Sequence, residues 1–336
     1  MGMVVLEGLR MRSERRPYTD ALHAVLIHRG WFRGSKAMLS GMTVTGFRFT
    51  VNRRLTAESA TAYNWHSENF LAADFTGMTS SQHMGFVFQP TWPLYRELAI
   101  AEIKASIDRG AGAVFWHGEF VVAAGYDDER SVLYYSDGRD SQLRELPYER
   151  FGNNGTPYWY YQIIEGRIPM DEHAIVKESF LQAIFKWETH DLALPERGYA
   201  CGRAAYDAIV TALRSGDYDR DGARETFATY AAFKRDLAEY TAGAAGVRSQ
   251  AAAVTREVDE HAAQRAGAWP EVAAAAECYG EVSRLFERIA AEPGLPDAER
   301  ILLFEAARQA EEQAIAALKA LVRETADNRY HDIGLR

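Results

Sequence analysis

The two cysteines are the first side chains to consider for chemistry, because a thiolate can act as a nucleophile or as a metal ligand. Cys201 and Cys278 lie far apart in the chain and form no CxxC motif. This spacing argues against a thiolate zinc site and against a disulfide framework, and it is typical of a protein in a reducing compartment. We therefore expect both cysteines to be buried, unreactive thiols.

A second pattern of chemical interest lies in DYDRDGARETFA, residues 217–228. Positions 1, 3, 5 and 6 of an EF-hand calcium loop are matched by Asp217, Asp219, Asp221 and Gly222. The last position of that loop requires a bidentate glutamate, but this chain has Ala228 there. We therefore interpret the segment as an acidic turn between helices, with calcium binding as the minor alternative.

The other common catalytic and nucleotide-binding motifs are missing from the sequence. His23 and His28 are five residues apart, which does not place them on one helix face as a metal pair. The chain contains no HExxH, no Walker A motif, no GxGxxG that opens a helix after a strand, and no GxSxG. We expect neither a metal nor a cofactor, and not an ordinary α/β-hydrolase.

Composition and charge limit the class of protein. The chain has 336 residues and a formal net charge of −9, and hydrophobic residues make up 47% of it. These values predict a soluble globular protein of two domains. The net negative charge argues against nucleic acid as a partner, and the lack of an apolar run of about 18 residues argues against a membrane. The charges of the N-terminus follow its apolar stretch, the reverse of a secretory signal, so we expect a cytoplasmic protein.

The chain changes character near residue 170, which predicts an α+β domain over residues 1–168 and an all-helical domain over residues 169–336. Residues 1–165 hold five of the seven tryptophans, whereas residues 171–325 are rich in alanine, glutamate and arginine. We expect five or six helices in the second part. The clearest covers residues 297–325, where one apolar stripe is formed by Leu303, Ala307, Ala310, Ala314, Ala317 and Leu321.

The first part predicts helices and strands that could position a site. A helix over residues 20–29 ends at Gly30, and Thr19 or Asp20 can cap its start. A second helix covers residues 94–108. Short aromatic and β-branched runs predict strands over residues 113–117, 119–125, 131–136 and 158–164, with a hairpin turn at 126–130.

Three stretches carry a resemblance to a known family. They are the helix ending at Gly30 with LSGMTVTGFRFTV (39–51), the helix to Asp108 with GAGAVFWHGEFVVAAGYDDE (110–129), and VLYYSDGRDSQLRELPYERF (132–151). In order and spacing these stretches resemble the N-terminal domain of the butirosin biosynthesis protein H family. That resemblance implies a papain-like fold with an antiparallel sheet, akin to the bacteriocin-processing cysteine peptidases. The helical second half fits the family in size and composition only.

The resemblance also implies a site, and the sequence departs from it. Papain-like chemistry uses a thiol at the start of the central helix, a histidine on a strand and an aspartate that orients it. Here the helix start reads Arg16-Pro17-Tyr18-Thr19-Asp20, without a cysteine. The position of the expected base is Glu119, with His117 two residues earlier, and Asp137 matches the acid. What the resemblance leaves is a cluster of His117, Glu119 and Asp137, with Thr19 as a weak nucleophile or part of an oxyanion site.

Two functions follow from the resemblance. In the first, the protein transfers an acyl group from a carrier-protein thioester to an amine or alcohol of a small molecule without a cysteine intermediate. Glu119 or His117 would then act as general base, since a thioester is already activated. In the alternative, the papain-like site is inactive and only binds a ligand or a carrier protein.

A further set of residues is expected to contact the substrate: Tyr18, Asp20, Arg48, Trp65 and Glu68. The aromatic segment at residues 62–70 either lines the pocket or packs in the core. Arg48 lies between Phe47 and Phe49, so we expect it to face solvent, or otherwise to pair with an acid such as Glu119.

A third class of function is a structural role. The alanine-rich helices and the aromatic first half could form a homodimer or dock an acidic acyl-carrier protein. A carrier protein would need a basic surface, and RMRSERR (10–16) with Arg33 and Lys36 offers one. The alternative is a solvated basic loop.

Overall fold

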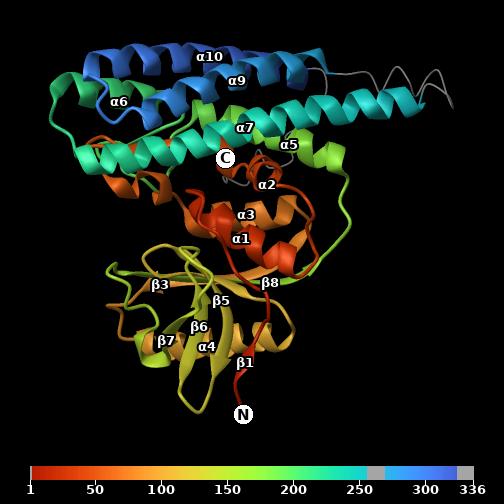
Figure 1. Cartoon of the computed structure of the whole chain (residues 1–336), viewed down its shortest axis with the longest axis vertical. Coiled ribbons are helices and arrows are strands. Elements are labelled where there is room, and N and C mark those ends of the chain that lie inside the picture. The colour runs from red at the N-terminus through yellow and green to blue at the C-terminus, as the bar shows by residue number, and fades with distance from the viewer. Residues whose placement is uncertain (1, 256–268, 324–336) are drawn as a thin grey trace. The chain divides into compact units, whose positions relative to one another are not determined.

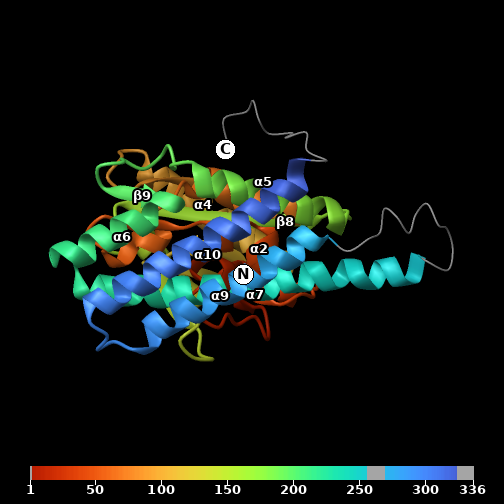
Figure 2. The same cartoon turned by 90° about the horizontal axis from the view of Figure 1, so that it is seen from above.

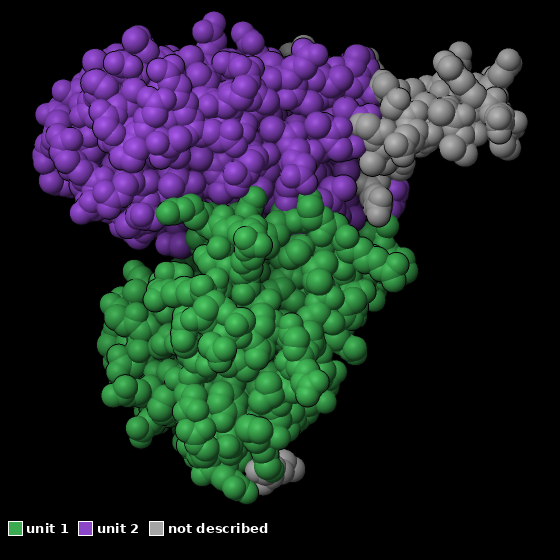
Figure 3. Space-filling model, viewed as in Figure 1, with its two compact units in different colours: residues 1–36, 65–170 green, residues 37–64, 171–336 purple. Residues whose placement is uncertain are grey.

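Short aromatic and β-branched segments of the first half pair into one antiparallel sheet in the computed structural model (Figure 1), which describes residues 2–255 and 269–323. The chain folds as two compact units (Figure 3): unit 1 comprises residues 1–36 and 65–170, and unit 2 comprises residues 37–64 and 171–336. The expected α+β class with an antiparallel sheet is confirmed.

The sheet belongs to unit 1, and its strands follow the order β3-β8-β4-β5-β6-β7, with β1 paired to β5. Every pairing is antiparallel. The bounds are β1 (Val4–Val5), β3 (Met78–Phe86), β4 (Ala113–Trp116), β5 (Phe120–Asp127), β6 (Val132–Ser136), β7 (Arg144–Pro147) and β8 (Tyr158–Arg167). The four strands expected from sequence correspond to β4, β5, β6 and β8, whereas no expected strand corresponds to β1, β3 or β7.

Helices cover both faces of this sheet. On one face lie α1 (Pro17–His28) and α3 (Trp65–Phe75), where the ring of Tyr18 packs 5.6 Å from that of Phe120. On the other face lies α4 (Trp92–Asp108), which shares a core cluster with Phe115 and Tyr161. The short helix η3 (Tyr148–Arg150) follows β7. Side chains alternate between the faces along each strand, so neighbouring residues of β4 and β5 serve two separate cores.

Unit 2 is mainly helical. Its helices are α2 (Lys36–Met42), α5 (Glu172–Glu188), α6 (Arg203–Ser215), α7 (Arg220–Thr255), α9 (Pro270–Ala291) and α10 (Asp297–Arg323). Figure 2 shows α7, α9 and α10 side by side. Two strands, β2 (Thr50–Asn52) and β9 (Tyr199–Cys201), form a small antiparallel sheet, and η1 (Thr45–Phe47) and η2 (Ala57–Thr61) flank β2.

Residues 37–64, which the sequence grouped with the first domain, belong to unit 2. The reason is a set of long-range contacts: β2 pairs with β9, and the ring of Phe49 packs 4.6 Å from Tyr230 and 4.8 Å from Tyr206. Unit 1 therefore differs by this segment from the expected domain of residues 1–168.

Within the described part of the chain, the helices are either too short or too polar to span a lipid bilayer.

Candidate functional site

His117 lies at the turn between β4 and β5, and its backbone N–H donates to the carbonyl of Glu119 at 2.8 Å. It follows Phe115 by two residues and therefore shares the sheet face that α4 covers. The imidazole packs edge-on against Tyr135, with ring centroids 5.3 Å apart. Its Nδ1 is buried and has no hydrogen-bond partner among the described residues. Burial lowers the pKa of His117, so the ring is neutral at pH 7.

Glu119 and Asp137 are brought together by an arginine that the sequence analysis did not single out. Arg139 lies 3.5 Å from Glu119 and 3.9 Å from Asp137, and Arg144 lies 3.2 Å from Asp137. The side chain of Glu119 is 59% exposed. The carboxylate of Asp137 is thus engaged by guanidinium groups, and the structure does not pair it with the imidazole of His117.

The start of α1 is closed by its own preceding loop. Tyr18, Thr19 and Asp20 are all buried. Asp20 accepts hydrogen bonds from the backbone N–H groups of Glu14 and Arg16, at 2.7 and 3.0 Å. Its carboxylate also pairs with Lys36 at 2.7 Å. In this arrangement Asp20 anchors the loop.

The face on which α1 packs separates Thr19 from the proposed base. The hydroxyl of Tyr18 donates to Gln162 of β8 at 2.8 Å, on the face opposite that of Phe115 and His117. Thr19 therefore belongs to one side of the sheet and His117 to the other. The structure does not assemble these two residues into a nucleophile–base pair.

Of the remaining expected binding residues, Trp65 and Arg48 are buried and Glu68 is half-buried. The indole of Trp65 lies 4.6 Å from that of Trp116 and 5.1 Å from the ring of Phe120, in a buried cluster. Glu68 is half-buried on α3. The expectation that Arg48 faces solvent is wrong: Arg48 is buried, and its guanidinium carbon lies 3.3 Å from the ring centroid of Tyr63. Stacking on an aromatic face explains this placement.

The expected basic surface is partly neutralised. Arg12, Arg16 and Lys36 each lie within 3.3 Å of the carboxylate of Glu14. These pairs, with the Lys36–Asp20 pair, take up much of the positive charge that a carrier protein would meet.

The expected acidic turn is confirmed only for residues 217–219, because α7 begins at Arg220 and contains residues 220–228. Asp219 accepts the backbone N–H groups of Asp221 and Gly222, at 3.1 and 2.9 Å, and Asp217 pairs with Arg54. These bonds satisfy N–H groups at the start of the helix. Among the described residues, no group of three or more His, Cys, Asp or Glu side chains is arranged to hold a metal ion.

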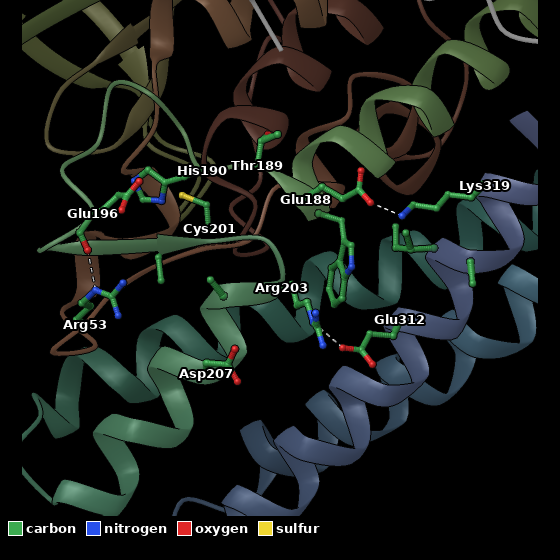
Figure 4. A pocket seen from close by; sticks show the side chains of 15 residues that line it. Arg53, Glu188, Thr189, His190, Glu196, Cys201, Arg203, Asp207, Glu312 and Lys319 are labelled. Carbon is green, nitrogen blue, oxygen red and sulfur yellow. Dashed lines mark hydrogen bonds and ion pairs between the residues drawn. The ribbon is translucent and has the colours of Figure 1, made fainter. Parts of the chain in front are cut away.

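A pocket of about 790 Å³ that no sequence motif indicates lies in unit 2 (Figure 4). Its walls come from the end of α5, from β9, from the first turns of α6 and from α10. Gly202 joins β9 to α6 with a φ of +56°, and a Cβ there would overlap the carbonyl oxygens of Lys186 and Trp187. Only glycine fits at this junction, which places Cys201 and Arg203 at the pocket wall.

Charges of both signs surround the pocket, as Figure 4 shows. The guanidinium of Arg203 donates to Glu312 at 2.7 Å, and Lys319 pairs with Glu188. On the other side, Arg53 donates to the backbone carbonyl of Glu196 at 2.8 Å. The apolar part of the lining is supplied by Trp187, Ala200, Ala204, Ile315 and Ala316.

Cys201 lines this pocket, but its environment does not activate it. The thiol is buried and accepts a hydrogen bond from the hydroxyl of Thr50 at 3.6 Å. Burial raises the pKa of Cys201, and burial also raises that of Cys278. Both groups are therefore thiols at neutral pH, whereas a nucleophile has to be a thiolate.

Comparison with known proteins adds no relative: no protein-family model matches the chain, and a search of curated proteins finds no match.

Proposed function

We propose that the protein binds a small zwitterionic molecule in the pocket of unit 2, without a covalent thiol intermediate. The observation that carries the proposal is the pocket lining: two ion pairs, Arg203–Glu312 and Lys319–Glu188, beside apolar side chains in a cavity of about 790 Å³. A cavity of this size suits a small organic ligand.

The ion pairs explain why the ligand would carry both charges. Arg203 and Lys319 are 61% and 41% exposed, and pairs of this kind contribute only ~0–1 kcal/mol to stability. A ligand can therefore exchange partners with them at low cost. Its carboxylate would bind Arg203, for which a guanidinium offers two parallel donors, and its ammonium would bind the released Glu312.

The proposal predicts that charge at both ends of a ligand is needed. We expect calorimetry to give at least tenfold tighter binding for δ-aminovalerate than for valerate or n-pentylamine, each of which lacks one charge. The variant Arg203→Gln should weaken the zwitterion at least tenfold, because it removes the carboxylate partner.

The matched control is Arg214→Gln, since Arg214 also lies on α6 and pairs with a glutamate of α10, Glu305, at 2.8 Å. Neither residue lines the pocket. This variant should bind like the unmodified chain. Equal affinity for the three compounds, or equal loss in both variants, would contradict the proposal.

This function differs in place from the binding alternative of the family resemblance, which put the ligand in the papain-like site, whereas the pocket lies in unit 2. We further propose that unit 1 is a papain-like domain of the butirosin H type that lacks its thiol. The order of the helix that ends at Gly30 and the stretches at residues 110–129 and 132–151 supports this assignment, together with a central helix, α1, that lies against an antiparallel sheet. Residues 39–51 of the first stretch lie in unit 2 and do not contribute to it.

One observation favours acyl transfer as a second candidate, namely the neutral, half-buried imidazole of His117. In this proposal an amine forms an amide bond with the carbonyl carbon of a carrier-protein thioester as the carbon–sulfur bond breaks. His117 takes the proton from the amine and passes it to the leaving thiolate.

This second candidate predicts a specific pH dependence. Because burial lowers the pKa of His117, the rate with an N-acetylcysteamine thioester should hold as the pH falls past the ordinary imidazole value and decline only below it. The variant His117→Ala should abolish product formation, whereas His66→Ala, at an exposed position, should not. Unchanged product in His117→Ala would exclude this mechanism.

A further inference from the structure

The two edges of the sheet in unit 1 differ in how they are protected. The edge strand β7 is four residues long and carries Arg144, Glu145 and Pro147, the kinds of residue that block pairing with another strand. The opposite edge strand, β3, is nine residues long and reads MTSSQHMGF. It contains no proline and no charged side chain apart from the titratable His83. An edge of this length and composition is a template for pairing.

Exposed apolar side chains surround the C-terminal half of β3. We call this surface the edge patch, and it consists of Met84, Phe86, Phe88, Tyr95, Leu98 and Tyr158, each 40–67% exposed. The ring of Phe86 lies 5.1 Å from that of Phe88 and 5.6 Å from that of Tyr158, so these three form one surface.

The edge patch continues from β3 onto α4, because a side chain of α4 packs on the strand next to β3. Tyr95 packs 5.4 Å from the ring of Trp159, and Trp159 is the β8 partner of Gly85. Leu98 follows Tyr95 by three residues on the helix, which places the two on one side. Apolar surface therefore borders the free edge of β3 on both faces of the sheet.

The size of this surface is close to what a stable interface requires. With about 200 Å² for a fully exposed large side chain, the edge patch leaves on the order of 500 Å² exposed. The backbone of Met84–Phe86 adds further area. A standard interface buries about 800 Å² on each partner.

We propose that β3 pairs antiparallel with β3 of a second copy of this chain, about a two-fold axis near Gly85. This register pairs Met84–Phe86 of the two copies and places Met84 opposite the partner's Phe86, so the two edge patches cover each other. Pairing at these three residues satisfies their free backbone groups, and the aromatic side chains supply most of the apolar contact.

The occupant is a second copy because the edge is compatible with itself. No fixed charge lies on β3, so two identical strands meet without like charges opposed. A contact between β3 and the β7 edge of another copy would bring Pro147 and charged side chains to the pairing edge, which disfavours open chains. The assembly therefore closes as a symmetric dimer.

The experiment is a charge swap on the full chain. Sedimentation equilibrium at micromolar concentration should give twice the chain mass for the unmodified protein. The variant Met84→Lys/Phe86→Lys should be a monomer, and so should Met84→Glu/Phe86→Glu, because each opposes like charges across the axis. An equimolar mixture of the two should again give a dimer, since Lys then faces Glu.

Two controls keep the outcome specific. Leu192→Lys, at a leucine of unit 2 that is 88% exposed, should remain a dimer. Circular dichroism should report the same fold in every variant, because the substituted side chains are exposed. The proposal would be overturned by an unmodified chain that is a monomer or that forms open polymers. It would also be overturned if the Lys variant or the Glu variant by itself remained a dimer, or if a monomeric chain bound extended peptides.

Discussion

Replacing Glu311 with glutamine is expected to lower the free energy of unfolding by about 3–5 kcal/mol, the cost of breaking a buried ion pair on one side. Lys234 of α7 and Glu311 of α10 are both buried, and the ammonium donates to the two carboxylate oxygens at 2.6 and 2.8 Å. Tyr206 donates to the same carboxylate at 2.6 Å. Without the negative charge, Lys234 must be neutral or remain charged without compensation. Urea denaturation followed by helical circular dichroism measures the loss.

The control for this prediction is Glu305→Gln, which removes the partner of Arg214 from an exposed pair on the same two helices as the Tyr206 contact. Its effect should stay within about 1 kcal/mol. The triple variant Tyr206→Phe/Lys234→Met/Glu311→Leu should recover most of the stability, because apolar side chains replace the two charges and the hydroxyl that donates to Glu311. If Glu311→Gln lowered the free energy of unfolding no more than Glu305→Gln does, the Lys234–Glu311 pair would not be buried in the way that the structure describes.

The same glutamate shows where periodicity predicts well and where it fails. The expected stripe on α10 is confirmed at Ala307, Ala314 and Leu321, which are buried. Its other members, at positions 303, 310 and 317, are only half-buried, and the core-facing residues are instead their neighbours Phe304, Glu311 and Leu318. A pattern of apolar residues cannot assign a glutamate to the core, because its place there depends on a lysine on another helix.

Strands were predictable where burial shaped their composition. The runs of β4 and β5 are buried throughout, and their apolar sequence follows from cores on both faces of the sheet. By contrast, β3 is polar and half-exposed, and it forms because β8 pairs with it along its whole length. Such pairing joins segments about 80 residues apart and leaves no local signal.

The candidate sites illustrate the same limit. The family resemblance predicted that Glu119 and Asp137 lie near each other, but Arg139 and Arg144 determine what their carboxylates do. The pocket in unit 2 has no motif, since its lining comes from segments around residues 53, 187–207 and 312–319. The only local sequence feature at this pocket is Gly202, between Cys201 and Arg203. Its importance follows from its positive φ, which the sequence does not show.

Substituting alanine for Gly41 is the second change with a large expected effect, a loss of about 3 kcal/mol in the free energy of unfolding. Gly41 lies in α2, and a Cβ at this position would overlap the ring of Tyr240. That ring cannot move freely, because its hydroxyl is hydrogen-bonded with Ser179 Oγ at 2.8 Å and its face packs near Phe47. Thermal and urea denaturation both measure the loss.

At a glycine with open space around it, substitution by alanine should raise the free energy of unfolding and not lower it. Gly243 lies inside α7, and a Cβ there would meet nothing within 4 Å, so Gly243→Ala should stabilise the protein by about 0.5–1 kcal/mol.

In a Tyr240→Leu background the ring is gone, and the cost of Gly41→Ala should fall below about 1 kcal/mol, a coupling that a double-mutant cycle measures. Equal costs with and without the ring would mean that Tyr240 does not fix the glycine. A coupling of the expected size would identify the first glycine of the LSGMTVTGF segment as the contact that lets α2 approach α7.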